Sequence, residues 1–360
     1  MRQRVVVTGA GVVAGAVVGG WDRLAAFLEA PPTMKSGAGT RVTDGVLATL
    51  VDESEARRLS RVCQLTVAAS RLALADARVD SGGDLGLVVG TEFGDLRSTV
   101  EFADGYLDRG PAGLSALLFP NTVMNTMAAA TAIAVGARAA TLTLNAPAVA
   151  GELAVARAAA TIMAGRAERV IAGGVDELHP VPGRVLDELG MVDDARSEGA
   201  TVLVLETLPF ARARHARILA EVRGAAWGAL PAHPCGVGRR TTSRVIETAL
   251  RAASLLERDV AWIYTSVSAD AARADWERAV VARAFHGEPP AAATLGTIVG
   301  HCAGSGALRV AAAAWTARSG RRVDGDGEAS LITRPGTSGL VHGLARGGTQ
   351  VALVVGPAEA

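Results

Sequence analysis

The sequence predicts an α/β fold built from two similar halves, and three observations lead to this prediction. Apolar runs typical of strands buried on both faces recur along the chain, for example Arg4–Thr8 and Leu85–Val89. Stretches of helical length and periodicity separate these runs. The alternation starts again after the Gly- and Pro-rich segment Trp227–Arg240. We therefore expect a mainly parallel sheet with helices on both faces, divided into halves at residues 1–225 and 226–360.

The elements expected in the first half follow in chain order. Besides the two strands above, we expect strands at Thr141–Asn145, Arg169–Ala172, Thr201–Glu206 and Arg217–Val222. Helices are expected at Trp21–Glu29, Glu53–Asp80, Leu96–Leu107, Met124–Val135 and Gly151–Ala164. The residues after Leu178 read as a polar loop that contains two prolines.

The second half repeats this pattern. Helices are expected at Thr241–Leu256 and Ala269–Phe285, and a loop at Gly296–Val310 is expected to lead into another helix. Strands are expected at Trp262–Val267 and at Val351–Val355.

The glycines after the first strand imitate a nucleotide-binding loop. Gly9, Gly11 and Gly15 have nearly the required spacing. A dinucleotide fold, however, needs a second strand that ends in Asp or Glu about 20 residues later, and a helix at Trp21–Glu29 stands there instead. The pattern favours a structural glycine turn, and no nucleotide cofactor is predicted.

The composition excludes several classes of protein. The 36 basic and 36 acidic residues balance, so the chain lacks the excess of positive charge that is typical of proteins that bind nucleic acid or an anionic membrane. No uninterrupted apolar run reaches the roughly 18 residues of a membrane span, and Met1 leads into a strand rather than a signal peptide. Cys63, Cys235 and Cys302 are too few and too far apart for a disulfide framework or a metal site. We expect a soluble, cytoplasmic protein without a metal.

The segment 139–178 carries the clearest functional signal. Its strand is followed by the bend Ala146–Ala148 and by a helix that opens near Gly151. A strand–bend–helix of this kind holds one side chain at a helix N-terminus, where unpaired N–H groups stabilise an anion. Enzymes place a nucleophile at such a bend. Here the bend carries no Cys, Ser or Thr, so the sequence predicts the elbow without its nucleophile.

Seven segments together resemble the β-ketoacyl synthase family of the thiolase superfamily, in the family's order. They are Arg4–Val13 (RVVVTGAGVV), Gly90-Thr91, Phe119–Asn125 (FPNTVMN), Val170–Gly174 (VIAGG), Ser197–Glu206 (SEGATVLVLE), Gly300-His301 with Gly304 and Gly306, and Gly347–Gln350 (GGTQ). The resemblance implies a thiolase fold of five αβαβα layers in two pseudo-duplicated halves. Within the family, the chain is most similar to the ketosynthase-like β subunits of type II polyketide synthases, called chain-length factors.

The family's catalytic residues do not carry over onto this chain. The position of the attacking Cys matches Ala148, and that of the first histidine matches Ser266. The second histidine matches His301, the supporting lysine matches Gly296, and the Phe of the gate motif matches Arg346. Because a condensation needs a covalently held acyl group, the resemblance implies no independent condensation and no catalytic residues.

Three residues of the helix expected after Gly90-Thr91 match the part of chain-length factors that lines the product tunnel. Asp95, Ser98 and Phe102 lie at spacings of three and four, which places them on one helix face. The resemblance implies that Phe102 blocks the tunnel and that Asp95 and Ser98 leave room. The alternative, without a functional role, is that Phe102 is an ordinary core residue and that Asp95 and Ser98 face water. Strand Thr141–Leu144 resembles the family's subunit-interface strand, so we expect a partner to cover it.

The leading hypothesis is a non-catalytic subunit that pairs with an active ketosynthase and shapes its chain tunnel, in bacterial type II polyketide or polyene biosynthesis. The partner would supply the nucleophile and the docking of an acyl carrier protein, whose phosphopantetheine would act on the partner's side; this chain itself would need no cofactor. Two alternatives stay open. One is a diverged acyltransferase that uses His301 as base, although a lone histidine beside glycines is more readily interpreted as a retained core residue. The other is a structural homodimer.

Overall fold

The computed structural model describes residues 3–31, 41–80, 82–191, 195–233, 236–266, 269–286, 288–325 and 327–358. Its strands are β1 (Val5–Ala14), β2 (Val17–Gly20), β3 (Gly86–Thr91), β4 (Thr141–Asn145), β5 (Arg169–Asp176), β6 (Gly199–Thr207), β7 (Ala220–Ala229), β8 (Val260–Thr265), β9 (Ala292–Ala293), β10 (Arg321–Val323), β11 (Ala329–Leu331), β12 (Ser338–Leu344) and β13 (Thr349–Gly356).

The helices are α1 (Trp21–Glu29), α2 (Asp44–Ala48), α3 (Glu53–Ala56), α4 (Arg61–Ala77), α5 (Leu96–Arg109), α6 (Thr126–Ala134), α7 (Ala150–Met163), α8 (Pro180–Glu188), α9 (Leu208–Ala213), α10 (Val245–Ala252), α11 (Ala271–Ala284), α12 (Gly296–Val299) and α13 (Ala303–Ser319), with 3₁₀ turns at Gly110–Gly113, Phe119–Thr122 and Glu257–Asp259. Among the described residues no helix is long and apolar enough to cross a bilayer.

The strands outside the small β10–β11 pair form one sheet whose two halves repeat the same topology. The order is β4-β3-β5-β6-β1 in the first half and β9-β8-β12-β13-β7 in the second, and β1 pairs with β7 where the halves meet. Numbered within its own half, each runs 3-2-4-5-1. The predicted pseudo-duplication is therefore confirmed. The proposed division after residue 225 falls inside β7, and Trp227, the first residue of the Gly- and Pro-rich segment, lies in the same strand.

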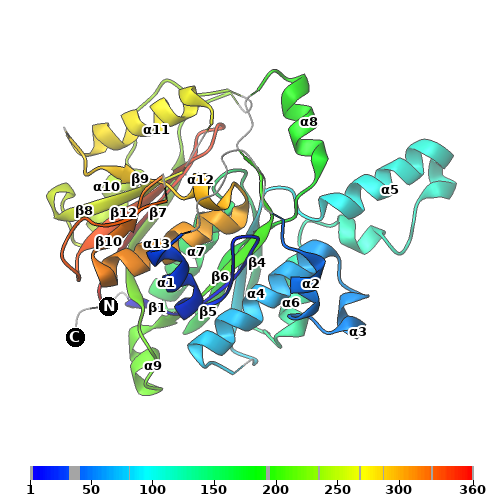
Figure 1. Ribbon diagram of the computed structural model, residues 1–360, viewed down its shortest axis with the longest axis horizontal. Coiled ribbons are helices and arrows are strands. Elements are labelled where there is room, and N and C mark those ends of the chain that lie inside the picture. The colour runs from blue at the N-terminus through cyan, green and yellow to red at the C-terminus, as the bar shows by residue number, and fades with distance from the viewer. Residues whose placement is uncertain are drawn as a thin grey trace.

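Helices separate and cover the two halves of the sheet, which gives the five predicted layers (Figure 1). Helices α4 and α6 pack on the outer face of the first half, and α10 and α11 pack on the outer face of the second. Helices α7 and α13 lie between the halves, in contact with each other and with strands of both. The thiolase-type αβαβα arrangement is confirmed.

The expectation of a mainly parallel sheet was wrong, because the sheet is mixed. Strands β3, β4 and β5 are mutually parallel, as are their counterparts β8, β9 and β12. The last strand of each half, β6 or β13, is antiparallel to both of its neighbours. Strand β13 follows β12 through a short hairpin, and a hairpin can only join antiparallel strands.

The continuous apolar runs in the sequence arise because the central strands are buried on both faces. In β6, Leu203 and Leu205 pack toward the middle helices, whereas Val202 and Val204 pack toward α4. Successive side chains of a strand point to opposite faces, so a strand between two helical layers needs apolar residues at every position. The sequence signal and the layer order thus have the same cause.

Of the glycines near the N-terminus, Gly9 and Gly11 lie inside β1, whereas Gly15 lies in the turn between β1 and β2. A Cβ added to Gly11 would come 2.0 Å from the carbonyl oxygen of Ala69 in α4. The role of Gly9 and Gly11 is therefore to let α4 pack closely on the sheet, and the resemblance to a nucleotide loop is coincidental.

Candidate active site

The elbow predicted around residue 148 is present. Strand β4 ends at Asn145, α7 begins at Ala150, and Ala148 between them has a φ of 67°. Left-handed backbone is uncommon for a residue with a Cβ and is typical of functional sites that the surrounding structure holds in place. The chain therefore keeps the backbone geometry of a nucleophile elbow around a methyl side chain.

The carboxylate of Glu92 occupies this elbow. Its Oε1 accepts a hydrogen bond from the backbone N–H of Ala148 at 2.8 Å and lies 2.8 Å from Nε2 of His301. Its Oε2 lies 3.3 Å from Nη1 of Arg196. A backbone N–H at such a bend is a ready site for an anion or a developing oxyanion. Here a buried side chain of the same protein fills it.

The environment of Glu92 favours its charged form. Burial penalises the charge, but His301, Arg196 and the N–H of Ala148 together outweigh that penalty and lower the pKa of Glu92 to about 2. The surrounding charges and the N–H of Ala148 thus favour the ionised, hydrogen-bonded carboxylate. An acyl oxygen could reach the Ala148 N–H only by displacing it.

A second buried carboxylate, that of Asp176, contacts the backbone of Glu92. Asp176, the last residue of β5, accepts hydrogen bonds from the backbone N–H groups of Glu92 at 2.9 Å and of Ala303 at 2.7 Å. It also accepts one from Oγ1 of Thr91 at 2.8 Å. Burial and the neighbouring charge of Glu92 nevertheless raise the pKa of Asp176 to about 7. This network connects the ends of β3 and β5 to the first turn of α13.

The elbow forms the floor of a cavity of about 540 Å³. Most of its walls are apolar and come from α8, from Phe93 before α5, from Leu96 at the start of α5, and from Pro147. Three of the residues singled out from the sequence line it: Ala148, His301 and Arg346. The polar loop expected after Leu178 is in fact α8, which the sequence analysis missed.

The gate-position residue Arg346 is fixed at the edge of this cavity. Its Nη1 lies 2.7 Å from Oδ2 of Asp270, the N-cap residue of α11. Arg273 of the same helix also lines the cavity and is buried. Where the family has an aromatic gate, this chain therefore places cations beside an apolar wall.

Ser266 does not reach the cavity lining. Its hydroxyl lies 2.5 Å from Oε2 of Glu277, and Oε1 of Glu277 lies 2.8 Å from Nδ1 of His342. All three side chains are buried. Neither Glu277 nor His342 was predicted as a site residue from the sequence, so this polar cluster is apparent only in the structure.

Of the three proposed tunnel residues, two lie in the first turn of α5. The Oδ1 atom of Asp95 caps the helix by accepting from the N–H of Ser98 at 2.9 Å, and both residues are buried. The alternative in which they face water is therefore wrong. Phe102 is half-buried, and its ring centroid lies 6.0 Å from that of Phe119. None of the three lines the cavity above Ala148.

The described cysteines are not reactive candidates. Cys63 and Cys302 are unpaired and buried, and burial raises the pKa of each thiol to about 11. Cys235 lies outside the described residues. Over the same described part of the chain, no group of three or more His, Cys, Asp and Glu is arranged to hold a metal ion.

The layers and the repeated topology define a thiolase-type fold. Residues 47–211 match the family profile "Beta-ketoacyl synthase, N-terminal domain", the same family that the motifs of the chain resemble.

The similar proteins include 3-oxoacyl-[acyl-carrier-protein] synthases and polyketide β-ketoacyl synthases. The "3-oxoacyl-[acyl-carrier-protein] synthase 2" of Synechocystis sp. is 27% identical over 76% of this chain and 73% of its own length. The "Putative polyketide beta-ketoacyl synthase 1" of Streptomyces halstedii is 28% identical over 87% of this chain and 85% of its own. The solved structure "The ishigamide ketosynthase/chain length factor" matches all of both chains with a TM-score of 0.86 at 22% identity, which establishes a shared fold.

Proposed function

We propose that this chain is a non-catalytic, ketosynthase-like subunit that pairs with a Cys-bearing ketosynthase and shapes the tunnel for the growing polyketide. One observation carries the proposal: the elbow holds Ala148, and the anion site beside it is filled by Glu92. A thiolase-fold condensation needs a nucleophile and a vacant oxyanion site at this bend, and this chain offers neither.

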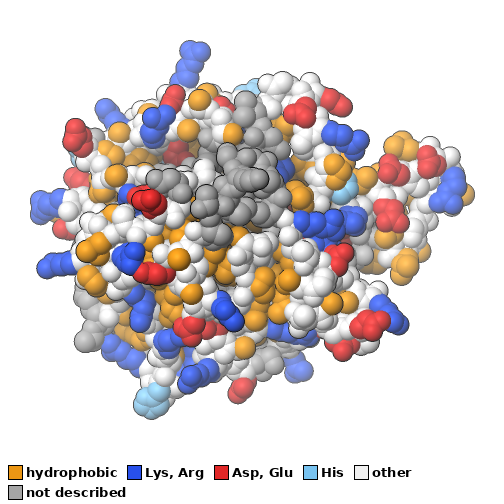
Figure 2. All heavy atoms as spheres, viewed as in Figure 1, with side chains coloured by type: hydrophobic (Ala, Val, Ile, Leu, Met, Phe, Trp, Pro, Cys, Tyr) orange, Lys and Arg blue, Asp and Glu red, His pale blue; other side chains and the backbone are white. Residues whose placement is uncertain are grey.

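An exposed apolar face supports the need for a partner. Strand β4 is at the end of the sheet, paired only with β3, and its Leu142 is 38% exposed. The adjoining segments from α5 to α6 expose further large apolar side chains: Tyr106, Leu107, Leu114, Leu117, Phe119, Val123, Met124 and Ile133. We call these residues, with Leu142, the α5–β4 face. Figure 2 shows apolar side chains on the projecting α5 region.

An open sheet edge beside an apolar surface is an aggregation hazard unless it is covered. A ketosynthase of the same fold would present a matching edge strand, and antiparallel pairing of the two edges would join the sheets of both subunits. Helix α5 would then lie at the interface, which is where Phe102 would meet a chain growing from the partner's active site.

The first test is co-expression with a Cys-bearing ketosynthase encoded beside this chain, followed by native mass measurement. We expect a one-to-one heterodimer that extends malonyl units from an acyl carrier protein. Leu142→Lys should abolish the heterodimer, because it places a charge on the paired edge. Leu331→Lys, a change at an exposed leucine of β11 away from that face, is the matched control and should leave assembly intact.

Two results would contradict the proposal. A stable homodimer that ignores the ketosynthase would remove the partner role. Loss of the complex's activity on His301→Ala in this chain, with assembly unchanged, would show that this chain takes part in the chemistry.

A second candidate is an acyltransferase that uses His301 as a base. The observation that favours it is the hydrogen-bonded pair of His301 and Glu92 at the floor of an apolar cavity, which resembles a base and the group that orients it. Acyl transfer to an alcohol or amine by the purified chain alone, abolished by His301→Ala, would establish this function in place of the first.

A further inference from the structure

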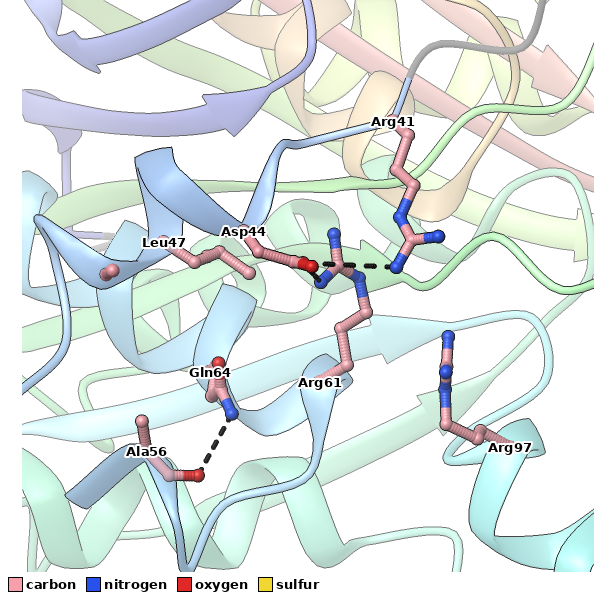
Figure 3. Close-up of a pocket in the computed structure, with 8 residues that line it drawn as sticks. Arg41, Asp44, Leu47, Ala56, Arg61, Gln64 and Arg97 are labelled. Carbon is pink, nitrogen blue, oxygen red and sulfur yellow. Dashed lines mark hydrogen bonds and ion pairs between the residues drawn. The ribbon is translucent and has the colours of Figure 1, made fainter. Parts of the chain in front are cut away.

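A second cavity, of about 410 Å³, lies beside α4 and shares no lining residue with the cavity above Ala148. Its lining contains three arginines from three different elements: Arg41 before α2, Arg61 at the start of α4, and Arg97 in the first turn of α5. The rest of the lining is Asp44, Gln64 and the small apolar surface of Leu47, Ala48 and Ala56. Figure 3 shows the carboxylate of Asp44 directed toward the guanidinium groups of Arg61 and Arg41, with that of Arg97 farther from it.

Buried carboxylates hold two of these arginines in place. Arg61 forms a bidentate ion pair with Glu198, in which Nε lies 3.0 Å from Oε2 and Nη2 lies 2.5 Å from Oε1. Arg97 donates from its backbone N–H and from Nε to the two oxygens of Glu177, at 2.9 and 3.2 Å. Both carboxylates are buried. These buried carboxylates fix the positions of Arg61 and Arg97 before a ligand binds, which reduces the conformational entropy that the two side chains lose on binding.

Donor groups remain for a ligand. Within the described part of the chain, the terminal nitrogens of Arg97 donate no hydrogen bond to a carboxylate. Arg41 approaches Glu198 and Asp44 only at 3.7 and 3.9 Å, beyond hydrogen-bonding range. About half of each of these two side chains is exposed. Helix α4 also begins at Arg61, so the positive end of a 17-residue helix meets the same cavity.

Asp44 shows where an anion is stable in this cavity. Its side chain is 83% exposed, yet its Oδ1 lies 2.7 Å from Nη1 of Arg61. The hydrogen bond and charge of Arg61, with the charges of Arg41 and Arg97, lower the pKa of this carboxyl below its ordinary value. A surface carboxylate of α2 thus occupies the point that Arg61 contacts and Arg41 approaches, and solvent can replace it at little cost.

We propose that this arginine cavity binds a phosphate group, either free phosphate or a phosphate monoester, and that Asp44 competes with it. Guanidinium groups match phosphate oxygens with paired hydrogen bonds. With Asp44 in place, the three arginines are balanced by three carboxylates, Asp44, Glu177 and Glu198, so the net charge of the cavity is zero. When the Asp44 side chain moves out, the cavity carries one net positive charge, which favours a phosphate dianion. The apolar patch formed by Leu47, Ala48 and Ala56 would accommodate the organic part of a monoester.

Titration calorimetry of the full chain at constant ionic strength tests the site, with inorganic phosphate and phenyl phosphate as the two probes and chloride as the background salt. We expect saturable one-to-one binding of phosphate. Arg41→Ala should weaken it about tenfold, and Asp44→Asn should strengthen it by a similar factor, the effect of one unit charge near the site. Both changed side chains are largely exposed, so folding should be unaffected. Arg57→Ala, at an exposed arginine of the same region that does not line the cavity, is the control and should change nothing.

The two probes distinguish the sources of the phosphate. Tighter binding of phenyl phosphate than of phosphate identifies a monoester whose organic part lies on the apolar patch, whereas equal binding identifies free phosphate. Heats that match chloride dilution would overturn the proposal, and so would an affinity that Asp44→Asn leaves unchanged. Binding of an acidic peptide without saturable binding of either phosphate probe would also overturn it, since the surface would then recognise a protein.

Discussion

A cysteine introduced at position 148 would measure the electrostatic effect of Glu92 on the elbow. A thiol at a helix N-terminus normally has a lowered pKa, because the helix dipole and the free N–H groups stabilise the thiolate. In this chain the carboxylate of Glu92 already lies 2.8 Å from the N–H of residue 148. The Ala148→Cys thiolate would therefore form beside an existing negative charge.

The size of the effect follows from Coulomb's law. Two like charges about 4 Å apart repel by about 4 kcal/mol at an effective dielectric constant of about 20, which corresponds to about three pKa units. Arg196 and His301 offset part of this repulsion because both contact Glu92. We therefore expect Glu92→Gln to lower the pKa of the introduced thiol by about one to three units.

The assay is the rate of iodoacetamide labelling at residue 148 as a function of pH, followed by peptide mass measurement. Ala148→Cys is compared with the Ala148→Cys, Glu92→Gln double variant, and the unmodified protein gives the background. That background should be low for the buried thiols Cys63 and Cys302, whose pKa burial raises to about 11. Coincident pH profiles for the two variants would refute the conclusion that Glu92 controls the charge at the elbow.

Three further predictions concern other parts of the molecule. Because the pKa of Asp176 is raised from 3.8 to about 7, the folded state holds more protons than the unfolded state between these values, so stability should fall as the pH rises through that window. Asp176→Asn should flatten this slope in urea midpoints measured from pH 4 to 7.5, and an unchanged slope would contradict it. Arg309→Met should destabilise the fold by about 3–5 kcal/mol, because it leaves the buried carboxylate of Glu152 without its cation; Arg278→Met, at an exposed pair, should have a far smaller effect in the same urea titration. Phe102→Ala in the heterodimer should lengthen the polyketide products analysed by mass spectrometry, and an unchanged product length would argue against a tunnel role for α5.

The sequence predicted the elbow well because its signal is local. The strand, the bend at Ala146–Ala148 and the following Ala-rich helix are adjacent in the chain, and the helix end itself creates the anion site. The same locality explains why most helices and strands were placed correctly. Helix α8 was missed because its two prolines indicated a loop. They lie in the first turn of the helix, where proline is tolerated.

Glu92 was missed because it lies 56 residues before Ala148. One signal could have found it. Glu92 directly follows a buried strand, and the carboxyl ends of neighbouring parallel strands meet at the same edge of a sheet. The contact between Glu277 and His342 spans 65 residues and has no comparable signal, since neither residue follows a motif.

The sequence by itself determined the layered fold and the absence of a nucleophile at Ala148, because burial on both faces of a strand and the residue at a bend are properties of short segments. Only the tertiary structure decided what occupies the elbow and where charges gather. Strand pairing brings Glu92 to the N–H of Ala148, and the fold brings Arg61 at the start of α4 and Arg97 in the first turn of α5 to one cavity. Electrostatic interactions depend on distance in space, so the charges that define these sites become neighbours only when the chain folds.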